Sequence, residues 1–314
     1  MQTKEYNIKF AKFEDIVFFN NEGTSKAARD IISGKNNKGK VFDENGIIMQ
    51  IQRDGSISYN PLRIAAGATQ LLLFYLTQSD YTLPETLEEF NDKEDYLDGV
   101  LKILMKYVDF IRDGDHIPAE GVRLYPYNFD FALHANKEET MYAPWYSGLA
   151  QAQMLILASQ LGRLFGKKYD EWCLELCESL VVPPCGVLDK DGYYWIDEYP
   201  NDKVFDGTLN GHICGLMALQ LYYAKIKDPE VKRFLDAGIY TVEHYANEFR
   251  NPGNACYYCL AHKTPCDKAN FKYHVCHIKQ FDWLYQITGD VFFKKFSGDL
   301  TKDLKKARKK LETK

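Results

Sequence analysis

The chain has 314 residues, of which 46% are hydrophobic and 26% are charged. This balance is enough for one large core or two modest ones, and it excludes an intrinsically disordered chain. The formal net charge is −5, so there is no global positive field to attract nucleic acid, and we expect no nucleic-acid partner.

The sequence shows no pattern typical of a membrane span or a secretion signal. Residues 1–5 are polar, and the longest uninterrupted apolar run, residues 71–76, is far shorter than a bilayer requires. We therefore expect a cytoplasmic protein without a membrane span, in a reducing compartment that does not favour disulfide bonds.

The first 60 residues have a mixed pattern, and the rest of the chain is dominated by helical spacing. Asn45-Gly46 and Asp54-Gly55 separate short apolar runs, which predicts a small β-meander. After Pro61 the apolar residues recur with the period of helices. We predict helices over residues 62–78, 96–112, 145–165, 168–181, 209–225, 230–249, 274–288 and 291–310.

The links between these predicted helices alternate between short and long. Residues 226–229 form a short polar link typical of antiparallel neighbours, whereas residues 113–144, 182–208 and 250–273 are long and rich in aromatic residues. Long loops gathered over one mouth are typical of an (α/α) toroid. The alternating residues 123–131 predict a strand at the rim of this mouth.

We therefore predict a mainly α fold. It is an incomplete (α/α) barrel or toroid of paired antiparallel helices, with a small N-terminal β-meander and a short inserted β-hairpin. Residues 1–60 are expected to form an extension packed on a main domain over residues 61–314.

Four of the eight cysteines crowd one region, together with three histidines. Cys256 and Cys259 form a Cys-x-x-Cys pair, which raises the question of a structural zinc site. The later spacings match no zinc ribbon or finger, however, and there is no second pair of this kind. We therefore predict ordinary buried thiols and no metal.

Five short segments place polar or aromatic side chains at the edges of predicted helices. They are Tyr59-Asn60-Pro61, residues 144–151, Glu198-Tyr199-Pro200, Leu209-Asn210-Gly211 and residues 273–280. In this order they resemble the D-glucuronyl C5-epimerase family over residues 55–295. The resemblance implies a helical (α/α) barrel that binds a glucuronic-acid-containing oligo- or polysaccharide such as heparosan. It also implies inversion at C5, from D-glucuronate to L-iduronate, without a metal or other cofactor.

Inversion at C5 needs a base on one face of the sugar ring and an acid on the other. The C5 hydrogen is weakly acidic, and negative charge develops on the adjacent carboxylate as an enediolate. The resemblance assigns the acid and base pair to Glu198 and Tyr273, with Tyr199 and Tyr258 as supporting phenols or alternative proton donors. Which group works on which ring face is left open.

The resemblance also suggests residues that would bind the substrate. Asn210 is placed to cap a helix or to hydrogen-bond the sugar, and Trp145 and Tyr146 to stack on a sugar face or to pack. His274 and His277 lie three apart at a helix start, where the helix dipole favours a carboxylate. The full predicted set is Asn210, His262, His274, His277, Gln280, Trp145, Tyr146, Gln151 and Arg123.

One position departs from the family pattern. Ala261 stands where the family has an arginine. A bidentate clamp on the uronate carboxylate is therefore missing unless His262, Lys263 or Arg123 replaces it. This departure leaves the exact saccharide open.

Three alternatives remain at this stage. A uronate lyase would share the first proton abstraction, and a glycoside hydrolase would pair Glu198 with Asp197, Asp206 or Asp130. The third alternative is a catalytically inert saccharide-binding protein. A homodimer is compatible with each of these interpretations.

Overall fold

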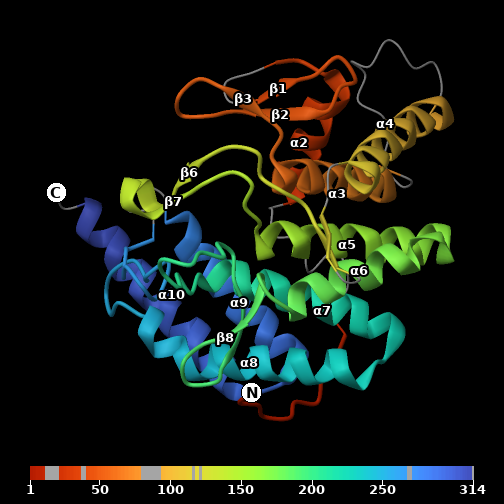
Figure 1. Cartoon of the computed structure of the whole chain (residues 1–314). Coiled ribbons are helices and arrows are strands. Elements are labelled where there is room, and N and C mark those ends of the chain that lie inside the picture. Colours follow the sequence, from red (N-terminus) through yellow and green to blue (C-terminus); the bar gives the residue numbers. More distant parts are fainter. Residues whose placement is uncertain are drawn as a thin grey trace.

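The computed structural model describes residues 1–10, 21–36, 40–78, 93–114, 117–119, 122–266 and 271–312. Within these ranges the fold is mainly helical, as predicted (Figure 1). The helices are α2 (Asn21–Ser33), α3 (Pro61–Gln78), α4 (Lys93–Asp113), α5 (Gly148–Phe165), α6 (Asp170–Val181), α7 (Leu209–Ile226), α8 (Pro229–Phe249), α9 (Lys272–Thr288) and α10 (Val291–Glu312).

The helices pack as consecutive pairs. Helix α3 packs on α4, α5 on α6, α7 on α8 and α9 on α10, and the first members of the pairs also contact one another in the order α3, α5, α7, α9. Because two-residue links join α7 to α8 and α9 to α10, these partners run antiparallel. The paired packing is confirmed, while closure into a toroid stays a prediction.

Sequence signals account for several helix ends. Asp228 caps α8 by accepting a hydrogen bond from the Glu230 backbone N–H at 2.7 Å, and Pro229 occupies the first helical position. Helix α5 begins three residues later than predicted, because Ser147 is the extended N-cap residue. Trp145, expected inside this helix, instead pairs with Tyr127 in an isolated β-bridge. Helix α2 has no counterpart among the predicted helices.

The strands form small antiparallel units. The predicted meander is present as β1 (Lys40–Phe42), β2 (Ile48–Ile51) and β3 (Ile57–Ser58). The predicted rim strand is split between two hairpins, one of β4 (Ile117–Ala119) with β5 (Val122–Leu124) and one of β6 (Phe131–Ala132) with β7 (Thr140–Met141). A further hairpin, β8 (Gly186–Leu188) with β9 (Tyr194–Ile196), was not predicted. The division at residue 60 stays a prediction.

Two properties of the chain follow from this architecture. No helix in the described ranges is long and apolar enough to cross a bilayer. All eight cysteines are free, and seven of them are buried. The prediction of buried thiols is confirmed for these seven, and Cys276 is half-buried.

Helix α7 is enclosed over most of its length and carries the β8–β9 hairpin directly on its surface. Its residues from Leu209 to Tyr222 are all buried. Gly211 and Gly215 lie four apart on one face of the helix. A Cβ atom at Gly215 would clash with the Ile196 side chain, and one at Gly211 would clash with that of Glu198. The two glycines therefore let β9 and the residues after it lie against the helix.

Gly215→Ala should destabilise the protein. The added methyl group would force Ile196 in the β8–β9 hairpin away from α7, and overpacking of this kind typically costs about 1–3 kcal/mol. Gly298→Ala is the matched control, because a Cβ atom at this position in α10 meets nothing within 4 Å. The control should be stabilised by about 0.5–1 kcal/mol through its higher helix propensity. Urea unfolding measures both changes, and equal stability of the two variants would contradict the close packing of β9.

Candidate active site

Glu198 follows β9 and lies over the first turn of α7. Glu198 is only 4% exposed to solvent. Asn210 Nδ2 donates a hydrogen bond to Glu198 Oε2 at 3.4 Å. A Cβ atom on Gly211 would occupy the space of this carboxylate. The Glu198 side chain therefore packs directly against the Leu209-Asn210-Gly211 segment.

Three phenols surround the Glu198 carboxylate. Tyr258 OH donates to Glu198 Oε1 at 3.5 Å, and the hydroxyl groups of Tyr199 and Tyr258 are 3.4 Å apart. The ring of Tyr273, in the first turn of α9, lies nearly perpendicular to that of Tyr258 with centroids 4.8 Å apart. All three tyrosines are half-buried. The four residues predicted to be catalytic therefore lie together, although they come from three separate segments.

Burial sets the protonation of this group. Removal from water raises the pKa of Glu198 from 4.5 to about 8, against the opposing effect of hydrogen bonds from Tyr199 and Tyr258. The same cause raises the pKa of the neighbouring Asp197 to about 7. The pKa of Tyr273 rises to about 12, first through burial and then through the negative charge of Glu198. Glu198 thus changes charge close to neutral pH, where a general base is most useful.

Two of the predicted binding residues, Asn210 and Gln280, form hydrogen bonds next to Glu198. Thr208 is the N-cap residue of α7, so Asn210 does not cap the helix. Gln280 Nε2, in α9, donates to the backbone oxygen of Asn210 at 3.0 Å and is 1% exposed. Asn210 and Gln280 therefore link α7 and α9 beneath the carboxylate.

The two histidines of α9 lie in the protein interior. His274 and His277 are fully buried. Nδ1 of His274 accepts from the Cys256 backbone N–H at 2.9 Å, and its Nε2 lies 2.8 Å from the backbone oxygen of Leu300. Burial lowers the pKa of His277 to about 3, so this ring is neutral. For His274 the expected contact with a carboxylate is corrected, because both ring nitrogens meet backbone groups that tie α9 to a loop and to α10.

Most of the remaining predicted binding residues pack inside the protein. Trp145 is 7% exposed and stacks on Tyr127 at 3.9 Å between ring centroids. Gln151 is fully buried and donates to the backbone oxygen of Arg123 at 2.6 Å. Tyr146, by contrast, is half-buried. Trp145 and Gln151 therefore pack, and Tyr146 retains a partly exposed ring.

An aromatic stack beside the site was not predicted. Phe131, in β6, stacks on Tyr199 at 5.8 Å and on Trp145 at 5.6 Å between centroids. It joins the buried ring of Tyr127 to the phenols through Trp145. The alternating aromatic pattern over residues 123–131 was the sequence signal for this stack, but it did not indicate the partner of Phe131.

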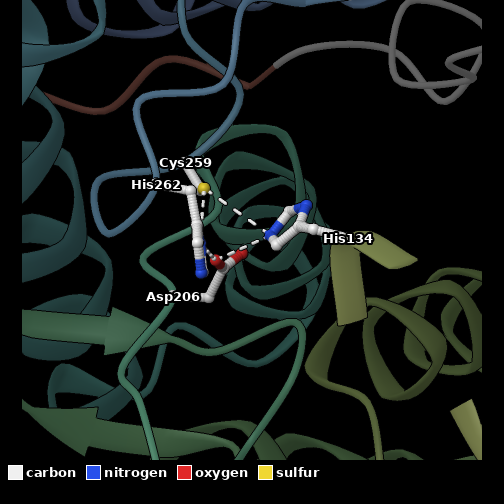
Figure 2. A group of neighbouring side chains, drawn as sticks. All are labelled: His134, Asp206, Cys259 and His262. Carbon is white, nitrogen blue, oxygen red and sulfur yellow. Dashed lines mark hydrogen bonds and ion pairs between the residues drawn. The ribbon is translucent and has the colours of Figure 1, made fainter. Parts of the chain in front are cut away.

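The three cations proposed to replace the missing arginine are engaged elsewhere. Arg123 forms an ion pair with Glu175 at 2.7 Å, and Lys263 forms one with Glu248 at 2.8 Å. His262 lies in a separate group with His134, Asp206 and Cys259 (Figure 2). These contacts of the three side chains are with residues other than Glu198.

Arg63, in the first turn of α3, is a cation that sequence reasoning missed. Its charge interacts with the phenol of Tyr127, whose own ionisation is opposed by the charge of Glu198. Desolvation lowers the pKa of Arg63, although the residue as a whole is exposed. No ion pair of Arg63 is formed within the described part of the chain. Arg63 therefore offers a cation near the site.

Glu198→Gln should stabilise the protein at alkaline pH. The pKa of Glu198 is raised in the folded state, so wild-type stability falls as the pH rises from 4.5 to about 8. Gln keeps the shape and carries no charge. We expect the variant to melt several degrees above wild type near pH 8.5 and close to it near pH 5.

Glu171→Gln is the control for this measurement, because it removes a carboxylate from the exposed face of α6. Its difference from wild type should not grow with pH. A Glu198→Gln variant that tracks wild type at both pH values would argue against a carboxyl group whose ionisation is opposed by burial.

Comparison with known proteins agrees with this geometry. The family described as D-glucuronyl C5-epimerase C-terminus matches residues 120–302, which is more than half of the chain. This range contains Glu198, Asn210 and all three phenols. No curated protein matches the chain. The chain belongs to the D-glucuronyl C5-epimerase family and is an isomerase acting on carbohydrates.

Proposed function

We propose that this protein inverts C5 of glucuronyl residues in an oligo- or polysaccharide, converting D-glucuronate to L-iduronate. Heparosan is the simplest substrate of this class. The observation that carries the proposal is the contact of a buried carboxylate, Glu198, with the phenols of Tyr199 and Tyr258, beside Tyr273. Membership of the family supports the reaction type.

In the proposed mechanism Glu198 is the base. Its carboxylate takes the C5 proton, and the electron pair of the broken C–H bond moves into the uronate carboxyl group as an enediolate. Tyr273 then gives its proton to C5 from the opposite face, which inverts the centre. Tyr258 and Tyr199 hold Glu198 in position through their hydroxyl groups. Exchange with water restores both groups, so solvent protons enter the product.

We further propose that Arg63 binds the uronate carboxylate. The enediolate carries an additional negative charge, and a guanidinium group that pairs with two oxygens stabilises it best. Arg63 and Glu198 each interact electrostatically with the Tyr127 phenol, so both charged groups lie in the neighbourhood of this ring. Arg123 and Lys263, in contrast, are held by Glu175 and Glu248.

The contacts of the other carboxylates disfavour the hydrolase alternative. Hydrolysis needs a second carboxyl group across the scissile bond from Glu198. Asp197 accepts from the Tyr199 backbone N–H at 3.1 Å, and Asp130 accepts from that of Ala143 at 3.0 Å. Asp206 is enclosed by two histidines. Each predicted partner of Glu198 therefore has another role.

Incorporation of deuterium at C5 tests the proposed reaction. Wild-type protein incubated in heavy water with heparosan oligosaccharides should label C5 of glucuronyl units, as read by NMR and mass spectrometry. Loss of the base in Glu198→Gln should slow labelling by roughly 10²–10⁴-fold, the usual contribution of a general base. Tyr142→Phe, at an exposed tyrosine, should leave the rate unchanged.

The same experiment separates the alternatives. Ultraviolet absorbance of an unsaturated product would show a lyase, and new reducing ends would show a hydrolase. Absence of exchange with any glucuronyl oligosaccharide would overturn the epimerase proposal. If no lyase or hydrolase product forms either, the result would favour a catalytically inert saccharide-binding protein.

Removal of the Arg63 guanidinium tests the carboxylate-binding role. A hydrogen bond to a charged group contributes about 1.5–3 kcal/mol, so Arg63→Gln should lower kcat/KM by roughly 10–100-fold. Arg163→Gln, at an exposed position in the last turn of α5, is the matched control. Arg63→Lys should recover part of the loss. An Arg63→Gln variant as active as the control would place the uronate elsewhere.

A further inference from the structure

Four metal-binding side chains converge beside the phenols. The ligand atoms of His134, Asp206, Cys259 and His262 all lie within 4.8 Å of one another, and Figure 2 shows the side chains pointing toward a common centre. His134 belongs to a short 3-10 helix, Leu133–Ala135, while the other three come from the loops before α7 and α9. We propose that this group binds a zinc ion.

The donor set and its spacing suit zinc. Imidazole nitrogen, thiolate sulfur and carboxylate oxygen are all zinc ligands, and this metal is bound by four of them in tetrahedral geometry. Ordinary Zn–S and Zn–N bond lengths place sulfur and nitrogen about 3.5 Å apart across a tetrahedral edge. Cys259 Sγ lies 3.5 Å from His262 Nδ1 and 3.6 Å from His134 Nε2.

The Asp206 oxygen lies slightly closer to the imidazoles than it would in a metal complex. Oδ1 is 2.9 Å from His134 Nε2 and 3.0 Å from His262 Nδ1. The corresponding edge around zinc is about 3.3 Å. A shift of a few tenths of an ångström therefore converts the hydrogen-bonded group into a metal site.

Two of the proposed ligands, His262 and Asp206, use their second polar atom to contact neighbouring side chains. His262 Nε2 lies 2.9 Å from Glu139 Oε2, and the Thr208 hydroxyl donates to Asp206 Oδ2 at 2.5 Å. Metal-bound imidazoles and carboxylates have outer partners of this kind, which orient the ligand atom toward the ion. Through these contacts Glu139 and Thr208 leave His262 Nδ1 and Asp206 Oδ1 facing the centre of the group. The two outer contacts are an observation separate from the short distances among the four ligand atoms.

Charge balance also favours a divalent cation. Asp206 and Cys259 are fully buried. As ligands they bring one carboxylate and one thiolate, whose two negative charges zinc neutralises, while the histidines bind as neutral rings. Buried charges need such a partner or metal.

The second group of candidate ligands, Cys256, Cys266 and His277, is less complete. It offers three buried donors, and His277 Nε2 has no hydrogen-bond partner within the described residues. Among the residues that the structure describes, this group therefore has neither a fourth ligand nor an outer partner for His277 Nε2. Zinc binding at this second group is one of the outcomes that the test distinguishes.

The proposed zinc ion has a structural role. All four positions of a tetrahedral ion are filled by side chains, which is typical of structural rather than catalytic zinc. Tyr258 precedes Cys259, and its ring lies 5.8 Å from that of His134. The ion would therefore fix the phenol that contacts Glu198. His262, expected to bind substrate, is assigned to this site instead.

Metal binding by the full-length protein tests the proposal. Protein freed of metal by a chelator and titrated with zinc sulfate should take up one ion per chain and melt at a higher temperature. Cobalt should give a thiolate-to-metal charge-transfer band that Cys259→Ser abolishes. Glu139→Gln, at a partly exposed position, should weaken zinc binding by roughly 10–100-fold while all four ligands remain.

Controls separate this site from other thiols and from misfolding. Cys276→Ser, outside both groups, should keep the cobalt band and the zinc affinity. Far-ultraviolet circular dichroism should show that Glu139→Gln keeps the wild-type helical content. The proposal is overturned if zinc does not bind, if Cys256→Ser rather than Cys259→Ser abolishes the cobalt band, or if folded Glu139→Gln binds zinc as tightly as wild type.

Discussion

The active site depends on the burial of one carboxylate against the start of a helix. Two effects oppose each other at Glu198: removal from water disfavours its charge, while the N-terminus of α7, Asn210 and the phenols favour it. Desolvation is the larger effect, because the pKa rises to about 8. The protein thus gives up stability at neutral pH to keep this carboxyl group buried, and the resulting proton affinity suits the general base proposed above.

The paired helices explain how three distant segments meet at this carboxylate. Helices α7 and α9 each begin at the site, with Asn210 in the first turn of one and Tyr273 in that of the other. Because α3, α5, α7 and α9 lie beside one another, the loops that precede them reach a common region. Gly211 then allows an approach that any side chain would prevent. A regular scaffold therefore positions residues that are 75 apart in sequence, from Glu198 to Tyr273.

The sequence was sufficient for the helices after residue 60 and for the four proposed catalytic residues, but not for helix α2 or for the surroundings of these residues. Apolar spacing shows that a segment is helical, yet it does not show what covers each face. His274 and His277 were expected to meet a ligand, whereas both are buried, and His274 is held by the preceding loop and by α10. The group around Asp206 was invisible for another reason: His134 and Cys259 are 125 residues apart, and no local spacing relates them.

The same group gives a physical reason for the departure at Ala261. The loop before α9 turns its polar side chains inward, with Cys259 and His262 directed to Asp206 and the Ala261 backbone N–H donating to the Asp206 backbone oxygen at 3.2 Å. In this conformation residue 261 is exposed at the surface. The loop is therefore engaged with Asp206 next to Tyr258, and under the proposed function a cation for the uronate would come from another element. Arg63 on α3 is the cation proposed for this role, since Arg63 and Glu198 both interact with the Tyr127 phenol.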